Sequence, residues 1–168
     1  MKIYTRTGDR GETSLYTGER VEKNSFRVNT YGMVDEANSA LGMARAFAAD
    51  PLIKEKIYRL QKLMPYLMAD LASLNQPALI VDENIEELER GIDEMDAQLP
   101  PLKNFVIPGD TPTGAMLDLA RTIVRRAERA FYTLGKLESV HEIDRVFLNR
   151  LSDYCFMLMR LADQSEKK

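Results

Sequence analysis

The sequence predicts an all-α fold, in which five helices form one bundle behind an irregular N-terminal segment. Five stretches place apolar residues at alternating steps of three and four, the period of a helix with one buried face. Proline and glycine separate these stretches, and no stretch alternates convincingly like a strand. With 168 residues, 45% of them hydrophobic, the chain can form one sizeable core. We expect a single domain over residues 1–168, with the irregular segment at 1–27 and the bundle at 28–164.

Composition argues against several functional classes. The net charge of −3 gives no basic field for nucleic acid, and no apolar run approaches the roughly 20 residues of a membrane span. Cys155 and His141 are each the only residue of their kind, so His/Cys metal clusters and Ser–His or Cys–His triads are poorly supported. The lone cysteine and the absence of a secretory signal indicate a cytoplasmic protein. Mg²⁺ remains compatible, because it binds carboxylates, water and substrate phosphates.

Residues 1–27 contain the polar run TRTGDRGETS. Gly8 and Gly11 let backbone N–H groups approach an anion, and the threonines add short donors. The run lacks the Gly-Lys-Ser/Thr of a P-loop, and composition alone favours an ordinary surface loop. A segment of this length without periodicity is, however, often functional. Lys23 and Arg27 add positive charge at its end.

The first three helices are expected at residues 28–49, 51–74 and 83–98. Pro65 falls inside the second and predicts a kink or a local break, because proline removes one backbone donor. Asp82 precedes the third and is expected to cap it.

The link at residues 99–110 holds Phe105, Val106 and Ile107 between prolines that stop any helix. Two interpretations are open. The run is either a hydrophobic loop tucked against the bundle or an apolar wall presented to a large flat ligand.

The fourth helix is expected from Thr111, as N-cap, to Leu134, with Pro112 at its first position. Six apolar residues form its buried stripe: Leu117, Ala120, Val124, Ala127, Phe131 and Leu134. A polar row borders this stripe: Asp118, Arg121, Arg125 and Glu128. On pattern alone such a row is a solvated face with ion pairs. The sharper interpretation is a clamp in which Arg121 and Arg125, one turn apart, grip a triphosphate.

The fifth helix is expected to start at a capping box of Ser139 and Glu142 and to end near Asp163. Cys155 is expected to pack as a small hydrophobic residue, and His141 to be an exposed residue of the first turn.

Several separated stretches together resemble the PduO-type ATP:cob(I)alamin adenosyltransferases. They are YTRTGDRGETSLYTGERVEKNSFRV, VDEANSALG, FVIPG, LARTIVRRAER and LNRLSDYCFMLMR, in that order over nearly the whole chain. The resemblance implies a five-helix bundle that assembles into a homotrimer, with ATP between neighbouring subunits and cobalamin close by. It implies transfer of the 5′-deoxyadenosyl group of ATP to the cobalt of cob(I)alamin, giving adenosylcobalamin and triphosphate. Mg²⁺ accompanies the nucleotide.

The resemblance also assigns roles to residues. Arg125 would bind the phosphates, and Arg121 would pair with Asp35 of an adjacent subunit. Glu128 would orient Arg125 or contact the nucleotide or Mg²⁺, and Phe105 would occupy the place of the lower axial ligand of the corrin. The full set of expected nucleotide-binding residues is Thr5, Arg6, Thr7, Gly8, Asp9, Gly11, Thr13, Lys23, Arg121, Arg125, Glu128 and Asn149.

Three positions depart from the pattern of the family. Asp110 stands where a second glycine is common, Asp118 where histidine is common, and Pro65 interrupts a helix that usually has none. The two acids disfavour another anion nearby and motivate an alternative: a non-catalytic adenosylcobalamin carrier or an ATP-sensing trimer. A purely structural bundle leaves the N-terminal segment without a role. For the enzyme, a reductase and a cobalamin-dependent enzyme are the expected protein partners.

Overall fold

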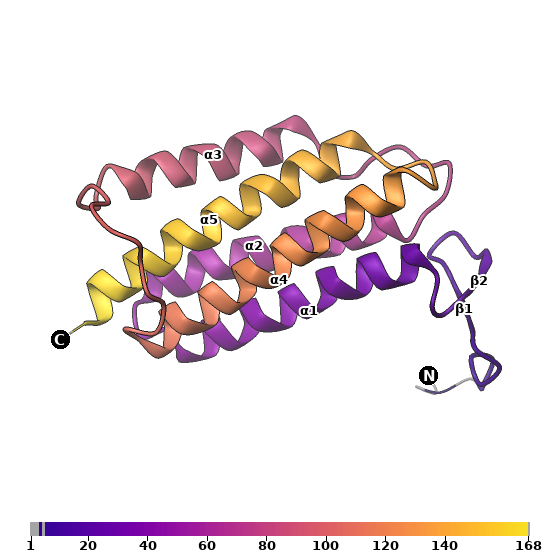
Figure 1. The fold of residues 1–168 in the computed structure, drawn as a ribbon, viewed down its shortest axis with the longest axis horizontal. Helices are drawn as coiled ribbons and strands as arrows, with labels where there is room; N and C mark the ends of the chain where they lie inside the picture. Colours follow the sequence, from indigo (N-terminus) through magenta and orange to yellow (C-terminus); the bar gives the residue numbers. More distant parts are fainter. Residues whose placement is uncertain (1–3, 5, 168) are drawn as a thin grey trace.

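The computed structural model describes residues 4 and 6–167. In that part of the chain, five long helices lie side by side and a small hairpin lies beyond one end of the bundle (Figure 1). The elements in order are β1 (Glu12–Ser14), β2 (Arg20–Glu22), α1 (Phe26–Phe47), α2 (Pro51–Leu71), α3 (Asp82–Asp96), α4 (Pro112–Gly135) and α5 (Glu142–Glu166). The predicted five-helix bundle is therefore confirmed.

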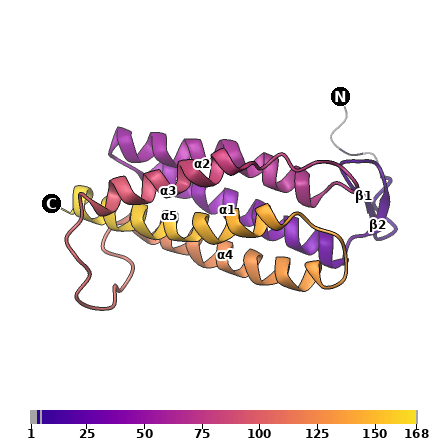
Figure 2. The same cartoon turned by 90° about the horizontal axis from the view of Figure 1, so that it is seen from above.

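Helix α4 lies between α1 and α5 in the packing of the bundle. Helix α1 also packs on α2, and α3 packs on α5 (Figure 2). The predicted apolar stripe of α4 is confirmed, since all six of its residues are at most 1% exposed. None of the helices among the described residues is both long and apolar enough to cross a membrane.

The start of α4 is confirmed, whereas the predicted cap of α3 is wrong. Thr111 Oγ1 accepts the Gly114 N–H over 2.9 Å, which makes it the N-cap of α4. Helix α3 instead starts with Asp82 inside its first turn and Val81 at the N-cap. The Val81 N–H donates to Oδ1 of Asn84 over 3.1 Å, so a side chain further along the helix satisfies the free backbone donor.

The predicted capping box of α5 is also wrong, because the helix starts at Glu142 with His141 rather than Ser139 at its N-cap. A distant arginine holds the link that precedes the helix. Arg27, 2% exposed, donates from Nη2 to the carbonyl of Ser139 over 2.9 Å and pairs with Glu138 over 2.7 Å. It also donates to the carbonyl of Leu71 over 2.9 Å. One buried guanidinium thus joins the start of α1, the end of α2 and the link before α5. His141 becomes the N-cap, half-buried rather than exposed.

Two expectations about single residues have different outcomes. Helix α2 continues through Pro65, so the local break does not occur; the flanking Met64 and Leu67 are fully buried in the core. Cys155 is fully buried, as predicted, and burial raises the pKa of its thiol to about 12. The thiol is therefore an inert part of the core.

The N-terminal segment contains two short strands that the sequence pattern did not reveal. β1 and β2 pair antiparallel, with Thr13 opposite Val21, and three residues are too few to display an alternating pattern. The hairpin is anchored to the bundle by buried Leu15 and by the Tyr16 N–H, which donates to the carbonyl of Ala72 over 2.8 Å.

Two buried carboxyl groups meet at the hairpin end of the bundle. Asp70, 4% exposed, accepts the N–H groups of Leu79 and Ile80 over 2.8–2.9 Å. Asp144 lies beside it and is 1% exposed. Burial, and then the charge of Asp70, raise the pKa of Asp144 to about 8, so its carboxyl group is mostly protonated at neutral pH.

The raised pKa of Asp144 predicts a pH dependence of stability. Between the ordinary aspartate pKa of 3.8 and the folded-state pKa of about 8, the folded protein holds a proton that the unfolded chain has lost. The free energy of unfolding should therefore fall as pH rises through this window, by at most about 1.4 kcal/mol per pH unit from this group. Asp144→Asn should reduce this decline in the free energy of unfolding, as measured by urea denaturation at pH 5, 7 and 9. Asp153→Asn, an exposed change on the same helix, is the control; an unaltered slope in Asp144→Asn contradicts the assignment.

Candidate functional site

The polar row of α4 lies on the side of the helix that meets α5, where Glu128 contacts Asn149. Arg121 is partly buried, and its Nε donates to Oδ1 of Asp118 over 2.8 Å within the same helix. The ion-pair interpretation therefore holds for this arginine. The bond engages only Nε, which leaves the terminal Nη groups of Arg121 as the donors for other partners.

Arg125, one turn further along, differs from its neighbours. Its side chain is exposed, and within the described residues its guanidinium has neither an ion pair nor a hydrogen bond. By contrast, Arg126 turns toward α1 and pairs there with Glu36. A planar cationic group without an internal partner suits a phosphate or carboxylate ligand.

Two further predicted residues, one on α4 and one on α5, contact each other. Nδ2 of Asn149 on α5 donates to Oε1 of Glu128 on α4 over 3.1 Å. Glu128 lies one turn beyond Arg125, so a carboxylate and an amide stand close to the unpaired guanidinium. The fold thus brings the predicted Arg121, Arg125, Glu128 and Asn149 to one face.

A second group of predicted residues gathers around the hairpin. The Lys23 N–H donates to the carbonyl of Gly11 over 2.8 Å, and the Lys23 side chain covers Gly8, where a Cβ would approach its Nζ to 3.1 Å. Gly11 has a φ of 88°, a left-handed conformation that glycine adopts without strain. Asp9 lies in the turn before β1, and Thr13 lies in β1. Thr5 lies outside the described residues.

Sequence reasoning missed Arg20 in this group. Its guanidinium donates to the carbonyl of Thr7 over 3.0 Å and to Oγ of Ser14 over 3.3 Å, and it pairs with Glu12 over 3.3 Å. A hollow of ≈ 590 Å³ lies here, lined by Arg6, Thr7, Arg10, Glu12, Ser14 and Arg20. The strand pairing sets Arg20 opposite Ser14, a placement that the sequence pattern does not indicate.

The two groups lie apart within one chain. The hairpin extends from the end of the bundle where α1 begins, whereas Arg121 and Arg125 occupy the middle of α4 (Figure 1). The glycine-rich segment therefore does not cover the polar row of its own chain in the described structure.

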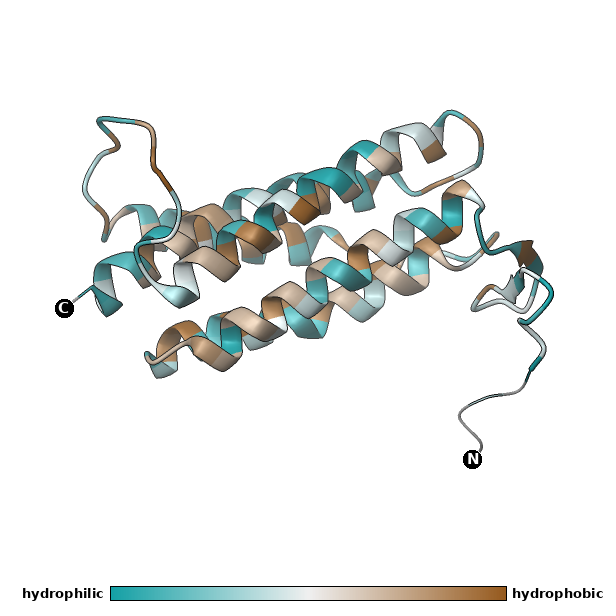
Figure 3. Cartoon of the chain, turned by 60° about the horizontal axis from the view of Figure 1, so that its bottom comes forward, coloured by the Kyte–Doolittle hydropathy of each residue, from teal (hydrophilic) through white to brown (hydrophobic). Residues whose placement is uncertain are grey.

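The link between α3 and α4 presents apolar side chains to solvent. Phe105 is 93% and Ile107 79% exposed, whereas Val106 packs against the core. The tucked interpretation is thus wrong for Phe105 and Ile107, and the loop stands away from the helices (Figure 3). Arg160 holds its beginning through the carbonyl of Pro100 over 2.5 Å. An exposed aromatic ring on an anchored loop can cover a large apolar ligand.

Both acids that depart from the family pattern have basic partners. Asp110 pairs with Lys167 over 2.6 Å, and Asp118 pairs with Arg121. Asp110 does not cap α4, because Thr111 does. Each negative charge that was expected to repel an anion is therefore locally compensated.

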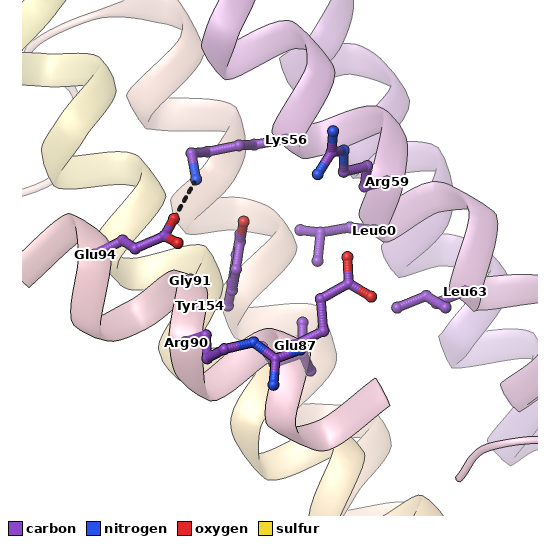
Figure 4. A pocket seen from close by; sticks show the side chains of 10 residues that line it. Lys56, Arg59, Leu60, Leu63, Glu87, Arg90, Gly91, Glu94 and Tyr154 are labelled. Carbon is purple, nitrogen blue, oxygen red and sulfur yellow. Dashed lines mark ion pairs between the residues drawn. The ribbon is translucent and has the colours of Figure 1, made fainter. Parts of the chain in front are cut away.

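Another hollow, of ≈ 310 Å³, lies between α2 and α3 and contains none of the predicted site residues (Figure 4). Lys56 pairs with Glu94 at its mouth over 3.6 Å. Tyr154 forms its floor, and burial raises the pKa of this phenol to about 12. Within the described residues, no three His, Cys, Asp or Glu side chains form a cluster that could hold a metal ion.

Comparison with known proteins gives one consistent result. The sequence model of a family described as "Cobalamin adenosyltransferase" matches residues 3–162. A corrinoid adenosyltransferase of Citrobacter freundii is 40% identical, and the match covers 96% of this chain and 95% of the relative. One of Bacillus subtilis is also 40% identical, over 97% of this chain and 87% of the relative.

Solved structures agree with the sequence relatives. A variant PduO-type ATP:corrinoid adenosyltransferase from Lactobacillus reuteri, complexed with cobalamin and ATP, superposes with a TM-score of 0.94 at 33% identity. The match covers 99% of this chain and 96% of that one.

Proposed function

Because the chain belongs to the cobalamin adenosyltransferase family, we propose that it transfers the 5′-deoxyadenosyl group of ATP to the cobalt of cob(I)alamin. The products are adenosylcobalamin and triphosphate. The observation that carries this proposal from the structure is the unpaired Arg125 guanidinium, beside the Glu128–Asn149 pair on one face of the bundle.

The reaction needs positioning and charge stabilisation rather than a protein base. The cobalt(I) electron pair of the corrinoid substrate forms a bond to C5′ of ATP, and the C5′–O5′ bond breaks. Its electron pair departs with the triphosphate. The negative charge that develops there calls for cationic groups placed in advance, and Arg125 with Arg121 can supply them. Mg²⁺, carried by the phosphates, would neutralise part of this charge.

The complete nucleotide site, in this proposal, forms between two copies of the chain. The polar row and the hairpin lie apart in one chain, so the Gly8–Lys23 segment of a neighbour would cover ATP on Arg125. Asp35 is exposed and has no ion pair within the described part of its own chain, which leaves it available for Arg121 of the neighbour. A homotrimer is the assembly that we propose.

Phe105 is proposed to lie beside the corrin. An aromatic ring offers the cobalt no donor atom, so it would favour a corrinoid without a lower axial ligand. Loss of that donor lowers the energy of the cobalt orbital that accepts an electron, and this makes cob(II)alamin easier to reduce. A reductase and a cobalamin-dependent enzyme are the protein partners that this chemistry calls for, and we place it in the cytoplasm.

The alternative, a carrier of adenosylcobalamin or an ATP sensor without turnover, has weaker support. It was motivated by Asp110 and Asp118, but Lys167 and Arg121 compensate their charges. Neither acid presents a free negative charge to an incoming anion.

The corrin spectrum tests the function directly. Protein mixed with ATP, Mg²⁺, cobalamin and a strong reductant should form a light-sensitive cobalt–carbon product. Arg125→Ala should lower kcat/KM by about 100-fold or more, because it removes a preorganised cation. Arg129→Ala, an exposed change one turn further along α4, is the control. Binding of both ligands without product favours the carrier, and near-normal turnover in Arg125→Ala removes this residue from the site.

The exposed ring of Phe105 predicts an effect that depends on the oxidation state of cobalt. Phe105→Ala should slow the reaction that starts from cob(II)alamin far more than the one that starts from chemically reduced cob(I)alamin. Both rates can be followed spectroscopically. Leu102→Ala, an exposed apolar change in the same loop, should alter neither rate. Equal rates of the wild type and Phe105→Ala from cob(II)alamin contradict the proposed role.

The proposed Asp35–Arg121 contact predicts a charge-dependent assembly. Asp35→Arg should shift trimers toward smaller species in sedimentation velocity, because it sets two like charges opposite each other. Combining Asp35→Arg with Arg121→Asp should restore part of the trimer. Intact trimers in the single variant, at every concentration measured, argue against the contact.

A further inference from the structure

A series of side-chain hydrogen bonds connects the polar row of α4 with α5 and α3. Nε of Arg150 on α5 donates to Oε1 of Glu89 on α3 over 2.6 Å. Nη1 of the same guanidinium donates to Oδ1 of Asn149 over 3.0 Å, and Nδ2 of Asn149 donates to Oε1 of Glu128 over 3.1 Å. Glu89 and Arg150 therefore extend the Asn149–Glu128 contact between α5 and α4 as far as α3.

The bond from Arg150 determines which end of the Asn149 amide faces Glu128. Arginine offers only donors, and an ionised carboxylate offers only acceptors. With its oxygen held by Arg150, the amide must turn its NH₂ group toward Glu128. The reversed amide would set donor against donor and oxygen against carboxylate, so it loses two hydrogen bonds at once.

Glu89 in turn restrains the guanidinium. Arginine is a long side chain with a planar fork, and engaging Nε fixes the plane in which Nη1 points. Both side chains of this pair are more than a third exposed, at 36% and 46%, so the pair contributes little to folding stability. The pair instead fixes the orientation of the Arg150 guanidinium, which contacts the Asn149 amide.

We propose that Arg150 is a positioning residue of the nucleotide site, which acts through the Asn149 amide and is itself held by Glu89. By setting the amide, Arg150 keeps Oε1 of Glu128 occupied and leaves Oε2, together with the second Asn149 N–H, directed to the nucleotide beside Arg125. The inference rests on the proposed function, since it concerns ATP at this face.

Calorimetric titration of the intact protein with MgATP tests the inference without relying on turnover. Arg150→Met keeps the length of the side chain but removes its donors. It should raise the Kd for ATP by about tenfold, the loss expected when one hydrogen bond from a charged group is removed. Asn149→Ala should weaken binding at least as much. The double variant should match Asn149→Ala, because Arg150 acts only through that amide.

Matched variants separate positioning from general effects of charge or folding. Arg90→Met removes an exposed arginine from the comparable Arg90–Glu86 pair on α3 and should leave the Kd unchanged. Glu89→Gln retains an oxygen acceptor for Nε and should bind ATP nearly as the wild type does, whereas Glu89→Ala should bind less tightly. This pair also decides the question if Arg150→Met fails to fold.

Three results overturn the inference. One is a normal Kd in Arg150→Met while Asn149→Ala binds weakly. Another is a double variant whose losses add, which makes Arg150 an independent contact. The third is equal binding by Glu89→Gln and Glu89→Ala. An unchanged Kd in Asn149→Ala instead removes the contact on which the proposed nucleotide site rests, so failure of the premise is distinguishable.

Discussion

The orientation of α4 about its own axis determines which of its charged residues face a ligand. Burying one leucine or phenylalanine side chain contributes about 1.5–3 kcal/mol, and an exposed ion pair contributes about 0–1 kcal/mol. The stripe from Leu117 to Leu134 therefore sets the rotation of the helix, and the charges take the positions that remain. As a result, Arg125 lies on the same side of the helix as Glu128, which contacts α5, whereas its sequence neighbour Arg126 faces Glu36 on α1.

Periodicity predicted the five helices because each buries one face, and Thr111 and Pro112 marked the start of α4. It failed where contacts come from far along the chain. The link before α5 is organised by Arg27, more than a hundred residues upstream, so a local capping pattern at Ser139 was misleading. The β1–β2 hairpin and its Arg20 were missed because strands of three residues carry no detectable alternation.

The residues of the candidate site, too, were only partly predictable from the sequence. Resemblance predicted Arg125, Glu128 and Asn149, and the fold brings them to one face of the bundle. Local pattern could not say which arginine of the row is already paired, nor that Phe105 stands in solvent while Val106 is half-buried against the core. It also could not reveal the basic partner of Asp110, since Lys167 is separated from Asp110 by the whole of α4 and α5.

In the proposed function, the distribution of these groups would tie catalysis to assembly. The chemistry needs cations placed around a departing triphosphate and a backbone cradle to enclose it. This chain carries both, but on different parts of the molecule: unpaired Arg125 on the middle of α4, and the glycine-bearing hairpin beyond the start of α1. A monomer would therefore leave ATP exposed on one side, where water competes for every phosphate contact. Enclosure by the hairpin of a neighbour, as proposed, would remove that water and strengthen the same charges, so assembly would itself supply part of the rate acceleration.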